Sequence, residues 1–136
     1  KRCVNDVCMR LAEVGRVRAN ADFLGVPYQG NRDVTLTVEP LKNGAKLSAT
    51  GETVYFLEYG SGAYQPSYAG ETPLGLERGS WSMSEKGKGH WDDPNGWYYA
   101  HRQRSMGNPP ANAMFHAEKD MERQANRVIQ EVLNQQ

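Results

Sequence analysis

The chain has 136 residues, and its sixteen Lys and Arg residues balance sixteen Asp and Glu residues, giving a formal net charge of zero. This length fits one domain, residues 1–136, because domains usually contain roughly 100 to 200 residues. The balanced charge argues against a protein whose main partner is nucleic acid or an anionic membrane. Hydrophobic residues make up only 38% of the chain, so the core is expected to be thin and to need partners that complete its burial.

The only cysteines are Cys3 and Cys8. On a helix, a step of five residues rotates the side chain by about 140°, which points the two thiols to different faces. We therefore expect two small apolar side chains in a reducing compartment, and neither a disulfide nor a redox pair. No apolar run approaches the roughly 18 residues of a membrane span, so no membrane contact is expected.

The first predicted element is a helix over residues 1–18. Its apolar residues recur at spacings of three and four, the pattern of a helix with one apolar stripe: Val4, Val7, Cys8, Leu11 and Val14. The segment from Asn20 to Asp33 contains Gly25, Pro27 and Gly30, and this composition predicts a loop.

Residues 34–59 are predicted to form an antiparallel hairpin and a further strand. Val34, Leu36 and Val38 alternate with polar residues, and Lys42 to Gly44 supply the turn before the pattern resumes at residues 46–50. The run from Thr53 to Tyr59 is rich in β-branched and aromatic residues. A short helical turn is the alternative for this run, but we favour a strand.

Residues 60–96 predict a long loop, because they contain many glycines and several prolines and show no periodicity. This loop also carries more aromatic residues than a disordered linker usually has. A loop that becomes ordered against a neighbouring subunit accounts for both observations. The candidate interface residues are Tyr64, Tyr68, Trp81 and Trp91.

A short aromatic strand is predicted at residues 97–100, followed by a basic run with His101, Arg102 and Arg104. Pro109 and Pro110 then stop the sheet and start a helix over residues 111–134, whose apolar residues again recur at three and four. The predicted fold class is therefore α+β, with an antiparallel sheet flanked by an N-terminal helix and a long C-terminal helix, and with a long loop rich in glycine and aromatic residues.

No residue pattern indicates catalysis, a metal or a cofactor. His90, Asp92 and Asp93 are the nearest approach to a metal set, but their spacing is not that of a zinc site. No serine stands in a nucleophile elbow, and the glycines around Lys88 do not form a phosphate-binding loop. We interpret four glutamates as solvated or interface charges: Glu52, Glu58, Glu71 and Glu77. The sequence thus predicts that the protein is not an enzyme.

Four motifs, in order along the chain, resemble the tail-completion family of long-tailed bacteriophages, minor tail proteins that act in head-tail joining. They are Val54–Gly62 (VYFLEYGSG), Gly87–His90 (GKGH), Gly96–Tyr99 (GWYY) and Gly107–Met114 (GNPPANAM). The resemblance covers nearly the whole chain, and the ordered series is more specific than any single motif.

The resemblance implies a structural virion protein, located in the neck or at the head-proximal end of the tail, and in the host cytoplasm during assembly. It implies partners as well: further copies of the chain in a hexameric or dodecameric ring around the DNA path, and adjacent neck and tail proteins. It implies no catalytic residue. Arg102 and Arg104 are candidates for passive contact with DNA in the lumen, and a polar rim or ion pairs between subunits are the alternative.

Two other interpretations remain open from the sequence. A small nucleic-acid-binding module would use Arg102, Arg104 and exposed aromatic residues to stack on bases, and its binding would depend steeply on salt. A hydrolase would need an active site in the loop of residues 63–93, where no nucleophile is recognisably paired with a base.

Overall fold

The computed structural model describes residues 2–28, 30–62, 64, 69–70, 97–99 and 103–135, with the backbone alone for 97–99 and 103–104. The chain is an α+β protein, as predicted. Its elements, in chain order, are α1 (Arg2–Gly25), β1 (Thr35–Leu41), β2 (Gly44–Thr50), α2 (Val54–Tyr59), β3 (Trp97–Tyr99), β4 (Gln103–Ser105) and α3 (Ala113–Asn134).

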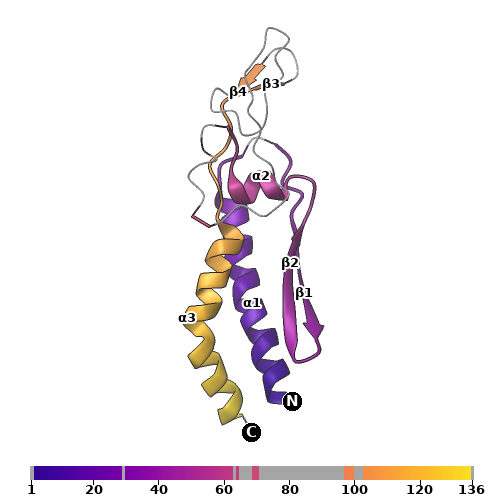
Figure 1. Ribbon diagram of the computed structural model, residues 1–136, viewed down its shortest axis with the longest axis vertical. Coiled ribbons are helices and arrows are strands. Elements are labelled where there is room, and N and C mark those ends of the chain that lie inside the picture. Colours follow the sequence, from indigo (N-terminus) through magenta and orange to yellow (C-terminus); the bar gives the residue numbers. More distant parts are fainter. Residues whose placement is uncertain are drawn as a thin grey trace.

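The two long helices α1 and α3 lie side by side and antiparallel, so that both termini are at the same end of the elongated molecule (Figure 1). Small residues let them approach closely: Gly15 and Ala19 on α1 and Ala117 on α3 are buried. Charged side chains at the edge of this contact also join the helices. Asp22 of α1 lies 2.6 Å from Nδ1 of His116, and Arg18 lies 3.4 Å from Asp120.

Helix α1 is longer than predicted, because it continues from Arg18 to Gly25. The buried stripe of α1 runs on through Ala19 to Phe23 at four-residue spacing, and this burial outweighs the weak helix propensity of Asn20. Arg32 supports the end of the helix by donating a 2.8 Å hydrogen bond to the carbonyl of Phe23.

The predicted hairpin is confirmed. Strands β1 and β2 pair antiparallel, with Thr35 opposite Thr50 and Val38 opposite Leu47, and Asn43 takes a positive φ of 60° in the turn. The hairpin packs on α1 rather than on α3, and β2 is the strand nearer to α3 (Figure 1).

The strand predicted for residues 53–59 is wrong, because Val54–Tyr59 forms the short helix α2. An apolar run this short has no periodicity that separates a strand from a helix. One helical turn buries Leu57 completely against Phe23 and Ala19 of α1 and Ala113 of α3. Tertiary packing therefore overrides the strand propensity of the aromatic residues.

A second two-stranded sheet forms from β3, inside the predicted strand of residues 97–100, and β4, which the sequence did not predict. The described strands thus make two separate hairpins instead of the single sheet that we expected. Helix α3 lies within the predicted range of 111–134. Most of the predicted loop of residues 60–96 lies outside the described residues.

Candidate functional site

Two of the four motifs that carry the phage resemblance meet in space. Residues 57–62, which end the first motif, lie against residues 106–115, which contain the last one. We call these two segments together the clasp. It sits where α2 meets the start of α3, above the helix pair (Figure 1).

Backbone hydrogen bonds join the two segments of the clasp. The amide of Ala111 donates to the carbonyl of Leu57 at 2.7 Å, and the amide of Asn112 donates to the carbonyl of Glu58 at 3.2 Å. The amide of Ser61 donates to the carbonyl of Asn108 at 2.9 Å. The first two bonds satisfy carbonyls that the short helix α2 leaves without a partner in its last turn.

Ser61 and Asn108 form a buried polar pair inside the clasp, with side chains 1% and 7% exposed. The Ser61 hydroxyl donates to Oδ1 of Asn108 and accepts from the amide of Asn108 at 3.2 Å. Nδ2 of Asn108 donates to the carbonyl of Phe56 at 2.8 Å. The side-chain polar atoms of both residues have hydrogen-bond partners, which offset the cost of their desolvation, so the pair can fix the geometry of the clasp.

The backbones in the clasp approach so closely that only glycine fits. Gly62 has a φ of +59° and Gly107 a φ of +102°, both in the range that favours glycine. A Cβ atom at Gly107 would lie 2.0 Å from the carbonyl oxygen of Ser61, and one at Gly62 would lie 2.3 Å from that of Met106. The close contact between the two segments therefore requires glycine at both positions, one in each motif.

Glu58 caps α3 from the opposite segment of the clasp. Its Oε1 accepts a 2.8 Å hydrogen bond from the amide of Met114, and its Oε2 accepts one of 3.4 Å from the amide of Phe115. A carboxylate at this place satisfies free N–H groups and complements the positive end of the helix dipole. Our interpretation of Glu58 as a solvated charge is wrong, since the residue is only 4% exposed.

An aromatic pair flanks the clasp. Tyr55 and Tyr59 stack with ring centroids 6.1 Å apart. Burial raises the pKa of Tyr59 to about 12, and the nearby charge of Glu58 acts in the same direction. Tyr55 and Tyr64, which flank the clasp in sequence, are 53% and 45% exposed, and Met106 at its edge is 46% exposed. Three large side chains in and around the clasp are therefore open to solvent.

Of the residues predicted to lie at subunit interfaces, the structure describes Tyr64, which is exposed. Tyr68, Trp81, Trp91 and Arg102 lie outside the described residues. The backbone of Arg104 lies in β4, opposite Tyr98.

The sequence interpretation missed Glu58, Ser61 and Asn108 as members of one site. An acidic residue between Leu57 and Tyr59 was the available signal, because a charge inside an apolar run often has a buried partner.

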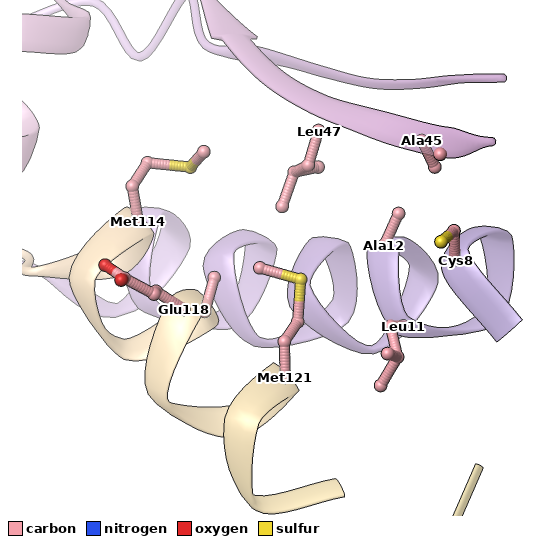
Figure 2. A pocket seen from close by; sticks show the side chains of 10 residues that line it. Cys8, Leu11, Ala12, Ala45, Leu47, Met114, Glu118 and Met121 are labelled. Atoms are coloured by element: carbon pink, nitrogen blue, oxygen red, sulfur yellow. The ribbon is translucent and has the colours of Figure 1, made fainter. Parts of the chain in front are cut away.

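A second feature is an open trough between β2 and α3, with α1 as its floor (Figure 2). It encloses a cavity of about 460 Å³. Leu47 from β2 and Met114 and Met121 from α3 point into it, as Figure 2 shows. The remaining lining residues are Cys8, Leu11, Ala12, Gly44, Ala45, Ala117 and Glu118. Glu118 is the only charged residue in this apolar lining.

The described residues contain no group of three or more His, Cys, Asp or Glu side chains placed to hold a metal ion. His90, Asp92 and Asp93 lie outside them. Within the same part of the chain, no helix combines the length and the apolar character needed to cross a membrane.

The chain was compared with protein-family models, with curated proteins and with solved structures, and no match was found in any of the three comparisons.

Proposed function

We propose that the protein is a structural subunit of the neck or the head-proximal tail end of a tailed bacteriophage, where it acts in tail completion and head-tail joining. In this proposal, copies of the chain form a ring around the DNA path and contact adjacent neck and tail proteins. The role is assembly, not catalysis, and the protein reaches the virion from the host cytoplasm.

The observation that carries the proposal is the clasp. The motifs at residues 54–62 and 107–114 are far apart in sequence, and the structure puts them into one buried, hydrogen-bonded contact. Their glycine, serine and asparagine residues serve backbone geometry there. This structural use of the motifs agrees with a family whose members have no catalytic residues, as the resemblance implies.

Exposed apolar surface gives further support. Val17, Leu24, Tyr55 and Leu133 are each more than half exposed, and the trough leaves part of α3 uncovered. In the proposal, neighbouring subunits cover the trough and these side chains.

Light scattering across a range of concentrations, followed by negative-stain imaging of the large species, tests the proposal. We expect closed rings with a central hole, formed by the protein alone or with an adjacent tail protein. A protein that stays monomeric and binds DNA with a steep salt dependence would contradict the proposal and favour the nucleic-acid-binding module.

In this proposal Arg102 and Arg104 are candidates for contact with DNA in the lumen of the ring, and a polar rim or ion pairs between subunits are the alternative. Replacing both with Ala is expected to leave ring formation intact and to weaken any retention of DNA by the ring. Rings that no longer form in the double variant would instead assign these residues to the contact between subunits.

A further inference from the structure

Helix α1 carries a second row of apolar residues, on the side opposite its buried face. The buried face contains Ala12, Gly15, Ala19 and Phe23. At about 100° per residue, the second row is centred roughly opposite Ala12. Its spacings alternate strictly between four and three, and its members, which we call the seam, are Cys3, Val7, Arg10, Val14, Val17, Ala21 and Leu24. Such spacings average 3.5 residues, which is the repeat of helices that pair in coiled coils.

The seam is accessible to a second helix. Val17 is 57% and Leu24 is 64% exposed, and Ala21 is exposed as well. Val14, Val17 and Ala21 also line an open groove of about 700 Å³ along the helix pair. The helix has 24 residues, so its seam extends over about three heptads. The apolar residues of the seam are therefore not used up by the packing of α1 within its own subunit.

The charges beside the seam favour another copy of α1, in parallel orientation, as the partner. One edge of the seam carries the exposed carboxylates of Asp6 and Glu13, and the other edge carries Arg18, which lies toward α3. In a parallel coiled coil, each edge faces the opposite edge of the partner, and residues five positions apart pair across the seam. Glu13 of one copy then meets Arg18 of the other, whereas an antiparallel pair would bring edges of like charge together.

Arg18 has donors left for this contact. Its Nε holds Asp22 at 3.1 Å, and one terminal nitrogen holds Asp120 at 3.4 Å. A guanidinium has five N–H groups, so the other terminal nitrogen can bind a third carboxylate. The exposed side chain of Glu13 can supply it.

The residue types in the seam agree with a two-stranded parallel pair. Val7 and Val14 occupy the a positions of the heptad, where β-branched side chains favour two parallel helices. Arg10 is the one polar member, and a single polar residue in a seam restricts the register while lowering the stability of the pair. Its guanidinium is drawn toward α3 by a hydrogen bond to Gln135.

We infer that α1 is the contact surface for a second copy of this chain, and that the two α1 helices pair along the seam in parallel and in register. The contact is two-fold symmetric, so by itself it joins subunits in pairs, and a closed ring needs a further contact. This inference goes beyond the proposed function and does not depend on it.

The native thiol of Cys3 tests the orientation in the full-length protein. In a parallel pair, Cys3 of one copy lies opposite Cys3 of the other, whereas in an antiparallel pair the two thiols are about 30 Å apart. We expect oxidation with copper phenanthroline to give disulfide-linked dimers on a non-reducing gel. Cys3→Ser should abolish these dimers. Cys8→Ser is the control and should leave them unchanged, because Cys8 lines the trough on another face of α1.

Two substitutions in the seam change the affinity in opposite directions. Val17→Glu buries a charge in the contact and is expected to weaken dimerisation at least tenfold in analytical ultracentrifugation. Asn5→Glu, which adds the same charge on exposed surface on the opposite side of α1, should leave it unchanged. Arg10→Leu replaces the polar member and is expected to strengthen dimerisation about tenfold.

Three outcomes would overturn the inference. They are association that survives in a folded Val17→Glu variant, association that Arg10→Leu weakens, and dimers that do not crosslink through Cys3. The outcome for the proposed function is read separately. Dimers that never assemble into rings would keep this contact and contradict the ring, and rings that form equally well in Val17→Glu, without a Cys3 crosslink, would keep the ring and contradict this contact.

Discussion

The clasp and the trough are neighbouring parts of the same molecule, yet they are filled to very different degrees. In the clasp, a single added Cβ atom at Gly107 would overlap a backbone carbonyl. In the trough, a cavity of about 460 Å³ remains between β2 and α3. The clasp is thus packed to contact between backbones, whereas the trough leaves apolar side chains uncovered.

The largest expected effect is that of a methyl group in the clasp. Gly107→Ala places a Cβ atom 2.0 Å from the Ser61 carbonyl oxygen at a φ of +102°, and we expect a loss of about 3 kcal/mol in the free energy of unfolding. Urea denaturation measures this loss. Gly25→Ala is the control, because a Cβ atom there meets nothing within 4 Å. Equal stability of the two variants would contradict the tight packing of the clasp.

Removing the carboxylate that caps α3 is expected to have the next largest effect. Glu58→Ala takes the acceptor from the amides of Met114 and Phe115, and the expected loss is about 2 kcal/mol. Glu118→Ala, an exposed residue of the same helix, should change stability by less than about 0.5 kcal/mol. Equal losses of stability in the two variants, measured by thermal or urea unfolding, would contradict the capping role of Glu58.

Adding volume to the trough is expected to act in the opposite direction. Ala45→Val adds two methyl groups beside the cavity and raises the strand propensity of β2, so a gain of about 0.5 kcal/mol is expected. Measured beside Gly107→Ala, this variant sharpens the contrast between the two regions. A clear loss of stability in Ala45→Val would mean that the trough is as tightly packed as the clasp.

The smallest effect is expected at Asp33, which joins the hairpin to α2. Hydrogen bonds from the Thr53 hydroxyl, and then from the amides of Glu52 and Thr53, lower the pKa of Asp33 below its ordinary value of 3.8. The ionised carboxylate therefore adds stability that is present above pH 3.8 and is lost as the pH falls through the lower pKa of the folded state.

Urea unfolding of Asp33→Asn at a series of pH values tests this linkage. The difference in the free energy of unfolding between the variant and the parent should be largest at neutral pH and should decrease in acid. Thr53→Val, which removes the hydroxyl, should reduce the pH-dependent part of this difference. A difference that does not change with pH would mean that Asp33 stabilises the fold by packing and not by its charge.

The sequence predicted the elements whose pattern is long enough to show a period. Helices α1 and α3 and the hairpin followed from apolar spacings of three to four and of two, and the α+β class followed from them. The exact end of α1 and the helical state of residues 54–59 could not be predicted. Both depend on the packing of Phe23 and Leu57 in one core, which brings distant segments of the chain together.

The clasp could not be predicted from the sequence for the same reason. Ser61 and Asn108 are 47 residues apart, and no local pattern indicates that they form a pair. The glycines beside them were visible in the sequence, but glycine in a turn and glycine under a crossing backbone have the same local signature. Only the motif series suggested that residues 54–62 and 107–114 share a purpose.

The pairing of α1 with α3 also governs when the protein can fold during synthesis. The ion pair between Arg18 and Asp120 spans 102 positions of the chain, so α1 leaves the ribosome long before its main packing partner exists. Contacts at this sequence separation form slowly, because a large loop must close first. The hairpin that follows α1 can cover one part of the helix early, but the face of α1 that packs on α3 stays uncovered during that interval, a state that favours aggregation. Expression at reduced temperature or with added chaperones is therefore expected to increase the yield of folded protein.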